Sequence, residues 1–122
     1  MNTISELAGI RVLTHAPDGV ALASEADALD LIGEAMGAEA DVVVVAADRV
    51  APAFYTLSSG IAGQVVLKFA GYRIRLAIVG DLTERLAASE SLRAFVYETN
   101  KGRDIWFPAD ERELAARLGP VL

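Results

Sequence analysis

The sequence contains no cysteine, and it has only one histidine and one tryptophan among its 122 residues. Without cysteine the chain can form no disulfide, thiolate zinc site, iron–sulfur cluster or cysteine nucleophile. Basic residues are also scarce, because 11 Lys and Arg stand against 17 Asp and Glu and leave a formal net charge of -6. An acidic surface repels a phosphate backbone, so we expect no nucleic-acid partner.

Long hydrophobic runs are missing as well. The longest, residues 42–47 and 76–80, are far shorter than the ~20 residues that a membrane-spanning helix needs. Residues 1–8 carry no basic segment and do not resemble a signal peptide. We therefore expect no membrane association and a cytoplasmic location in a bacterium. The length and the 53% hydrophobic content predict one domain over residues 1–122, which needs no metal, cofactor or partner to fold.

The hydrophobic pattern predicts strands that alternate with helices. Ala8-Gly9 separates two short apolar segments and is typical of a β-hairpin turn. The unbroken apolar run that follows Asp41 predicts a strand covered on both faces, because it shows no alternation. Five strands are predicted, at residues 4–7, 10–14, 42–47, 74–79 and 105–107.

Apolar residues at helical spacing predict four helices between and after these strands. The second is expected to run unbroken from Pro52 to near Gly71, because its apolar residues recur every three to four positions. The third is expected to end with Asn100 or Gly102 in the left-handed conformation. The predicted helix starts lie after Ser24, at Pro52, after Ser89 or Ser91, and after Asp110.

This alternation predicts a mixed, mostly parallel sheet with right-handed crossovers. A functional site is then expected outside the carboxyl ends of the parallel strands, at a topological switch point. The candidate ends are Ala47-Asp48, Gly80-Asp81 and Phe107-Pro108. Asp48 and Asp81 at neighbouring strand ends could share a metal, a proton or a ligand amine. We favour the simpler alternative, in which each starts a turn or caps the following helix.

Ser58-Ser59-Gly60 is the most distinctive short run in the sequence. A serine hydroxyl near a helix start is a candidate phosphoacceptor, since a phosphate there meets free backbone N–H groups. Alternatively, Gly60 and Gly63 let the helix approach the sheet closely. Pro52 favours this second interpretation, because a helix that begins there would place both serines inside it, where N–H groups are not free.

Other chemistry is weakly represented. The run at residues 58–63 is neither a dinucleotide-binding fingerprint nor a nucleophile elbow, and the sequence has no Walker A motif. His15 is the only possible imidazole base, and we interpret it as structural or solvent-exposed. Glu98 and Asn100 are typical of a hydrated helix C-terminus.

The chain resembles the bacterial domain-of-unknown-function family 4180. The residues that carry this resemblance are 54–63, Lys68-Phe69, Tyr72, Leu76–Asp81, Ser91–Arg93, Phe95, and Tyr97-Glu98 with Asn100 and Gly102. The resemblance implies a small α/β domain similar to the sulfate-transporter and anti-sigma-factor-antagonist (STAS) architecture, with no established activity. In that architecture a Ser-Ser-Gly turn after a strand is phosphorylated, although here ten residues separate Ala47 from Ser58. Ala53 replaces an acidic residue that family members often carry, which disfavours an enzymatic site there.

These observations predict a non-enzymatic regulatory or interaction module that binds a protein partner or a small ligand, with no catalytic residue assigned. The candidate binding face comprises Asp48, Asp81, Glu98 and Asn100, and the candidate phosphoacceptors are Ser58 and Ser59. One alternative is a small cofactor-independent enzyme that uses Asp48, Asp81 and Glu98 in a pocket. The other is a structural protomer of a homodimer.

Overall fold

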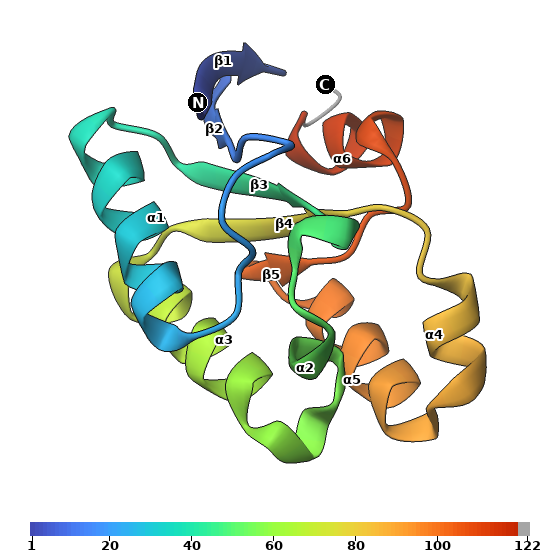
Figure 1. Ribbon diagram of the computed structural model, residues 1–122. Helices are drawn as coiled ribbons and strands as arrows, with labels where there is room; N and C mark the ends of the chain where they lie inside the picture. Colours follow the sequence, from blue (N-terminus) through green and yellow to red (C-terminus); the bar gives the residue numbers. More distant parts are fainter. Residues whose placement is uncertain (120–122) are drawn as a thin grey trace.

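Five strands form one sheet in the computed structural model, which describes residues 1–119 (Figure 1). They lie in the order β1-β2-β3-β4-β5. Strand β1 pairs antiparallel with β2, and the other three pairings are parallel. The strand bounds are β1 Thr3–Leu7, β2 Ile10–Thr14, β3 Val42–Ala46, β4 Arg75–Val79 and β5 Ile105–Trp106. The predicted mixed, mostly parallel sheet with an N-terminal hairpin is therefore confirmed.

The hairpin turn is as tight as its sequence predicts. Ala8 and Gly9 both have positive φ, at 55° and 81°. Two successive left-handed residues are what a two-residue turn needs to match the twist of its flanking strands. The turn therefore sets the register in which Leu7 faces Ile10 and Thr3 faces Thr14.

Three of the predicted helix starts are confirmed by their caps. The side chains of Ser24, Ser89 and Asp110 each accept a hydrogen bond from a backbone N–H in the first helical turn. Such caps satisfy N–H groups that have no partner within the helix. The helix bounds are α1 Glu25–Gly37, α2 Pro52–Tyr55, α3 Ile61–Tyr72, α4 Thr83–Ala88, α5 Glu90–Lys101 and α6 Glu111–Leu118.

The prediction of one long helix from Pro52 is wrong. Helix α2 ends at Tyr55, a short 3-10 turn covers Leu57–Ser59, and Gly60 takes a left-handed conformation with φ 80° before α3 begins. The apolar spacing continues across this break because α2 and α3 bury side chains in the same core. Periodicity reports which side of a segment is buried, and it does not report whether the helical hydrogen bonds are continuous.

Two further expectations fail locally. Residues 83–88 form helix α4, which the sequence analysis did not predict. Helix α5 ends at Lys101, and Gly102 follows with φ -85°. Asn100 is still helical, so neither Asn100 nor Gly102 takes the expected left-handed conformation.

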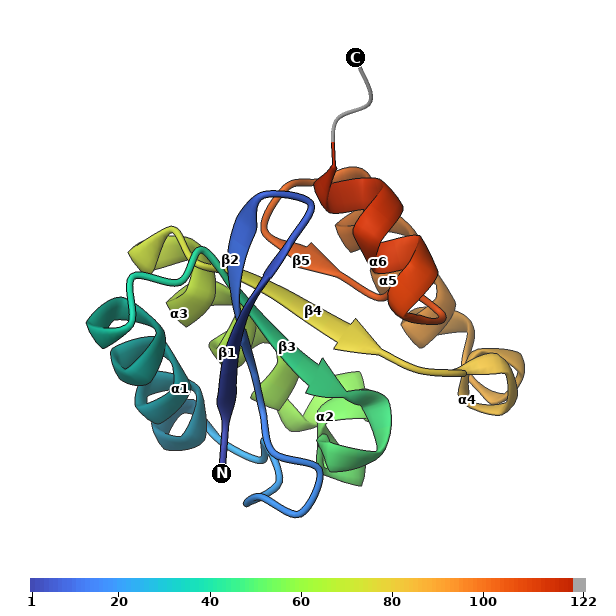
Figure 2. The same ribbon diagram turned by 90° about the horizontal axis from the view of Figure 1, so that it is seen from above.

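Helices cover both faces of the sheet, but unequally (Figures 1 and 2). Helices α1, α3 and α5 lie on one face, and α6 lies on the other, beside the hairpin. Val43 and Val45 belong to the core on the first face, whereas Val42 and Val44 belong to a second cluster with Leu114 of α6. The prediction that the valine-rich strand is covered on both sides is therefore confirmed.

The strand order contains no reversal, so the expected topological switch point is absent from the sheet of residues 1–119. Each parallel crossover moves one strand further in the same direction. Right-handed crossovers that all step the same way place their helices on the same face. At a switch point, neighbouring crossovers run in opposite directions and leave a crevice between them. No such crevice forms in the sheet of residues 1–119, so a binding site at this edge of the sheet needs other walls.

Candidate functional site

The carboxyl ends of β3 and β4 lie together at one edge of the sheet. These strands pair in parallel from Val42 with Arg75 to Ala46 with Val79. Beyond them, Gly80 has φ 154°, and a Cβ atom at this position would lie 2.7 Å from Cβ of Ala47. The two loops thus touch, and the expectation that these strands run side by side in the same direction is confirmed.

Asp48 and Asp81 both lie on this edge but hold different positions. Asp48 is exposed in a 3-10 turn at Ala47–Arg49. Asp81 accepts hydrogen bonds from the side chain and the backbone N–H of Thr83, and these bonds lower the pKa of Asp81. Asp81 therefore fixes the turn that precedes α4, which is the simpler role that its position allowed. Neither carboxylate lines either of the two cavities described below.

Tyr55 joins the same edge, which the sequence analysis did not anticipate. Its buried hydroxyl donates to the backbone carbonyl of Ala47 at 2.8 Å. The guanidinium of Arg85 lies 4.3 Å from the centre of its ring. Burial raises the pKa of Tyr55 to about 12; Arg85 opposes this rise, whereas Asp48 adds to it. The phenol therefore stays protonated at neutral pH and ties α2 to the end of β3.

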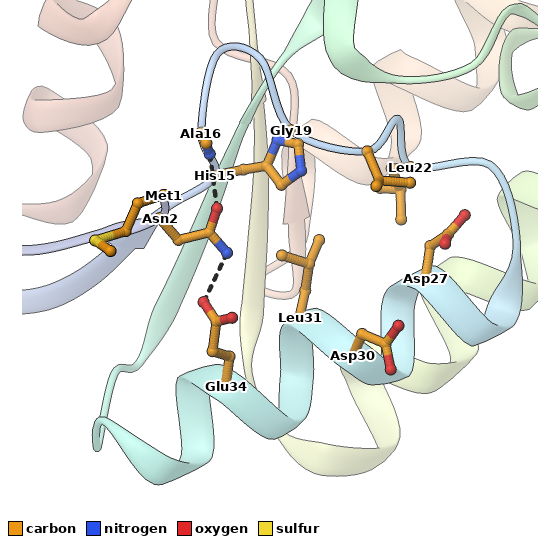
Figure 3. A pocket seen from close by; sticks show the side chains of 11 residues that line it. Met1, Asn2, His15, Ala16, Gly19, Leu22, Asp27, Asp30, Leu31 and Glu34 are labelled. Carbon is orange, nitrogen blue, oxygen red and sulfur yellow. Dashed lines mark hydrogen bonds between the residues drawn. The ribbon is translucent and has the colours of Figure 1, made fainter.

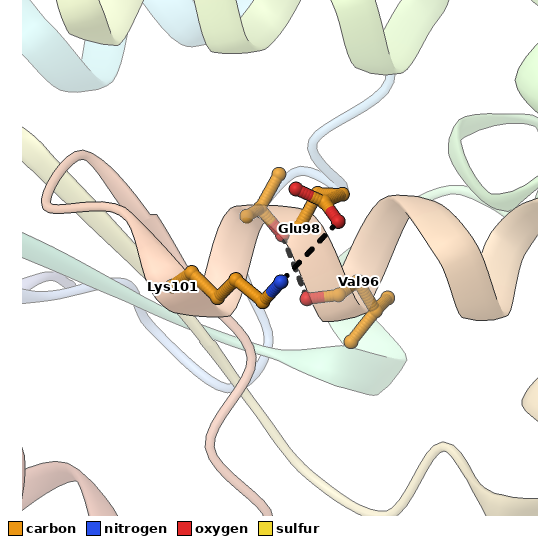
Figure 4. A network of polar contacts seen from close by, with 4 residues as sticks. Val96, Glu98 and Lys101 are labelled. Atoms are coloured by element: carbon orange, nitrogen blue, oxygen red, sulfur yellow. Dashed lines mark hydrogen bonds and ion pairs between the residues drawn. The ribbon is translucent and has the colours of Figure 1, made fainter.

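Glu98 and Asn100 of α5 have structural partners. Glu98 is exposed and forms an ion pair with Lys101 at 3.5 Å (Figure 4). An exposed pair of this kind contributes at most about 1 kcal/mol. Oδ1 of Asn100 accepts a hydrogen bond from the backbone N–H of Phe107 at 2.7 Å. This bond holds the chain after β5 against the end of α5.

A shallow groove lies beside α4 and α5. Its volume is about 580 Å³. Arg93 donates a hydrogen bond of 2.6 Å to the carbonyl of Leu86 and so links the two helices along the groove. Of the four residues predicted for the binding face, only Asn100 lines it. Its lining residues are Leu86, Glu90, Arg93, Ala94, Val96, Tyr97 and Asn100.

Ser58 and Ser59 are exposed and lie in the short 3-10 turn that precedes α3, not inside one continuous α-helix. Oγ of Ser59 donates to the carbonyl of Ala53 at 2.7 Å and accepts from the N–H of Ile61 at 3.2 Å. The hydroxyl of Ser58 takes part in none of the hydrogen bonds found within residues 1–119. The argument from Pro52 that favoured a packing role is therefore wrong, because the helix breaks before Gly60.

A larger cavity, of about 750 Å³, lies at the carboxyl end of β2 (Figure 3). We call it the α1 pocket. Helix α1, the first two residues and the loop from His15 to Leu22 surround it. Its lining residues are Met1, Asn2, His15, Ala16, Gly19, Val20, Leu22, Asp27, Asp30, Leu31 and Glu34.

The walls of the α1 pocket combine apolar side chains with carboxylates. Ala16, Leu22 and Leu31 are buried and supply apolar surface. Asp27, Asp30 and Glu34 come from α1, at spacings of three and four residues. This spacing places them along one side of the helix, so all three face the same cavity.

Hydrogen bonds hold the pocket in shape. Leu22 bonds to the backbone of Arg49 and Ala51, and so fixes the end of the loop beside β3. Oδ1 of Asn2 accepts from the N–H of Ala16 at 2.7 Å, and its amide donates to Glu34 at 2.6 Å (Figure 3). The side chain of Asn2 thereby connects the start of the chain, the loop and α1.

His15 is a buried wall of this pocket and is not exposed. Its side chain is only 8% exposed, and Nδ1 has no hydrogen-bond partner within residues 1–119. The backbone N–H of His15 continues the ladder by donating to Val44 at 2.8 Å. This site was not among the sequence-based candidates, because these were limited to the strand ends at residues 47–48, 80–81 and 107–108. The parallel pairing of β2 with β3 places the carboxyl end of β2 at the same edge of the sheet as the carboxyl ends of β3 and β4.

The polar side chains that line the α1 pocket are those of Asn2, His15, Asp27, Asp30 and Glu34. Within residues 1–119 no group of three or more metal-ligating side chains is placed to hold a metal ion. No helix in this range is long and apolar enough to cross a membrane.

The fold and the site define a small α/β domain with a five-stranded mixed sheet and a cavity at the end of its second strand. The family model described as a domain of unknown function (DUF4180) matches residues 7–118. The chain therefore belongs to this family, as its resemblance implied. No curated protein and no solved structure gives a significant match.

Proposed function

We propose that this chain is a non-enzymatic module that binds a small ligand at the carboxyl edge of its parallel strands. The α1 pocket carries the proposal. It combines buried apolar walls with a few polar groups that converge on one cavity, which is the usual composition of a small-molecule site. Its volume, about 750 Å³, falls within the range of known ligand pockets, roughly 300–1,000 Å³.

The His15 imidazole has no partner within residues 1–119 that would orient it as a general base. A general base is normally oriented by a partner and reaches a nucleophile. No hydrogen bond or ion pair within residues 1–119 joins the His15 imidazole to a carboxylate or a hydroxyl. The enzyme alternative with Asp48, Asp81 and Glu98 gains no support, because none of the three lines either cavity.

The direct test is a heteronuclear NMR screen of the chain with small neutral, anionic and cationic compounds. We expect amide shifts to cluster at residues 15–22 and 27–34 for at least one compound, and we expect that compound to be recovered chemically unchanged. Shifts that cluster only at the α4–α5 groove would move the site there. An absence of specific shifts with every class of compound would refute the proposal.

Regulation by phosphorylation is the second part of the proposal. The supporting observation is that Ser58 is exposed and its hydroxyl takes part in none of the hydrogen bonds of residues 1–119, whereas Ser59 is engaged with Ala53 and Ile61. We therefore expect modification at Ser58 before Ser59. Phosphopeptide mass spectrometry on protein from its native host tests this. Finding both serines always unmodified would remove the switch.

A homodimer is a second candidate, favoured by strand β1. Four of its five residues are exposed, including Ile4, and among the strands of residues 1–119 it pairs with β2 alone. An unprotected edge strand of this kind can pair with a second copy. Light scattering should then give twice the monomer mass, and Ile4→Lys should lower it. A monomeric mass for the unchanged protein would refute this candidate.

A further inference from the structure

The α1 pocket carries an excess of negative charge. Asp27, Asp30 and Glu34 line it, and no Lys or Arg side chain is among its lining residues. None of the three carboxylates takes part in the two ion pairs found within residues 1–119, which join Lys68 to Glu25 and Lys101 to Glu98. A concave surface that carries one sign of charge concentrates ions of the opposite sign. The charged side chains that line the pocket therefore favour a cation over an anion.

The carboxylates are positioned in advance, and each keeps an open acceptor. Oδ2 of Asp27 is held by the N–H of Ala23 and the hydroxyl of Ser24, at 3.0 and 3.1 Å. Oε2 of Glu34 is held by the amide of Asn2. The second oxygen of each carboxylate, and both oxygens of Asp30, accept none of the hydrogen bonds found within residues 1–119. These oxygens are therefore available to the N–H donors of a ligand.

The spacing along α1 fits a ligand with two positive groups. Asp30 and Glu34 are four positions apart on α1, which corresponds to ~6 Å along the helix axis. Asp27 and Asp30 are closer, at ~4.5 Å along the axis. A single ammonium group can contact the carboxylates of only one of these two pairs at a time. Two ammonium groups joined by a short flexible chain can contact Asp30 and Glu34 together.

His15 gives a second and independent indication of a ligand. Its side chain is more than nine-tenths buried, lines the α1 pocket, and leaves Nδ1 without a partner within residues 1–119. Buried polar groups almost always have a hydrogen-bond partner, so an orphaned one calls for an explanation. A neutral imidazole has one nitrogen that accepts a hydrogen bond. Because Nδ1 has almost no accessible surface, an ammonium N–H of a ligand reaches it and supplies the missing donor only when the loop over the ring shifts.

We propose that the α1 pocket binds a short aliphatic diamine. Its two ammonium groups contact the carboxylates of α1, one of them also reaches His15, and its methylene chain lies against Leu22 and Leu31. This inference rests on the proposed function, because it names the class of ligand that the same pocket takes.

The probe is 1,4-diaminobutane, with 1,4-butanediol and succinate as matched compounds of the same chain length. We expect 1,4-diaminobutane to bind in isothermal titration calorimetry and to shift the NMR signals of His15 and residues 27–34. We expect neither the diol nor the dicarboxylate to do so. Binding should also weaken as salt is added, because exposed charges are screened.

Asp30→Asn is the sharpest variant, because the Asp30 side chain forms no hydrogen bond or ion pair within residues 1–119 that the change would remove. We expect it to weaken 1,4-diaminobutane binding roughly three- to fivefold, the loss typical of one partly exposed charge pair. Asp48→Asn is the control, since it makes the same change of charge at an exposed position outside the α1 pocket. It should leave the affinity unchanged.

The outcomes separate the two proposals. If the diol or succinate binds at residues 15–34 as well as 1,4-diaminobutane does, the diamine assignment is overturned and the proposed function stands. The same holds if 1,4-diaminobutane does not bind but another compound of the NMR screen occupies the pocket. Equal losses in Asp30→Asn and Asp48→Asn would show non-specific attraction to an acidic protein and overturn the assignment. If no compound of any charge occupies the pocket, both proposals fail.

Discussion

Gly19 and His15 approach so closely that a Cβ atom at position 19 would lie 2.9 Å from Nε2 of the imidazole. The same Cβ would also lie 3.2 Å from the carbonyl oxygen of Ala16. The loop between β2 and α1 therefore closes over the ring only because residue 19 has no side chain. This contact positions the single histidine of the chain in the wall of the α1 pocket.

Gly19→Ala should displace the imidazole. Because the added methyl group overlaps a buried ring, we expect a loss of ~1–3 kcal/mol in the free energy of unfolding and a change in the His15 ring signals by NMR. Gly33→Ala is the matched control, since a Cβ there meets nothing within 4 Å in the middle of α1. It should stabilise the protein by ~0.5–1 kcal/mol, as alanine does relative to glycine in a helix. Equal His15 signals in both variants would contradict the proposed contact.

Gly80→Ala should destabilise the carboxyl edge. Gly80 has φ 154°, which L-residues rarely adopt, and its added Cβ would lie 2.7 Å from Cβ of Ala47. We expect a loss of ~2–4 kcal/mol in urea unfolding, from backbone strain and overlap together. Ala47→Gly in the same chain removes the overlap and leaves the strain. A double-mutant cycle should therefore show partial recovery, and strict additivity would contradict the contact.

Tyr55 should make stability fall at high pH. Its phenol loses a proton near pH 10.0 in the unfolded chain and at about 12 in the folded one. Its contribution is therefore complete below pH 10 and is lost as the pH rises through 12, by about 2–3 kcal/mol in total for a shift of this size. Tyr55→Phe lacks this titration, so its unfolding free energy should fall less between pH 9 and pH 12 than that of the unchanged protein. Parallel pH profiles for the two proteins would contradict burial of the hydroxyl.

Asn100 should act on stability and not on ligand binding. Asn100→Leu removes the acceptor for the N–H of Phe107, and an unsatisfied buried donor costs about 1–3 kcal/mol. Asn100→Asp keeps an oxygen at the same position and should lose much less. Urea unfolding measures both changes, and the calorimetric titration with 1,4-diaminobutane should not change in Asn100→Asp. Weaker diamine binding in that variant would return Asn100 to the candidate site.

The candidate site was only partly predictable from the sequence. Asp48 and Asp81 were correctly expected at neighbouring strand ends, because β3 and β4 are buried on both faces and run in parallel. The α1 pocket was not expected, since its walls come from residues 1–2, 15–22 and 27–34. Asp27, Asp30 and Glu34 have the spacing of any solvated helix face, and only the loop above them turns that face into a cavity.

What the sequence alone determined are the features that depend on residues a few positions apart. Ser24 caps α1 and Asp110 caps α6, and Ala8-Gly9 turns the hairpin, because each needs only a local hydrogen bond or a local backbone angle. Only the tertiary structure decided that the strand order never reverses, and that His15 lies in a pocket whose other walls come from α1 and residues 1–2. These features depend on contacts between segments that lie far apart in the sequence. Hydrophobic burial is not directional, so the pattern of apolar residues does not determine which buried segments pack against each other.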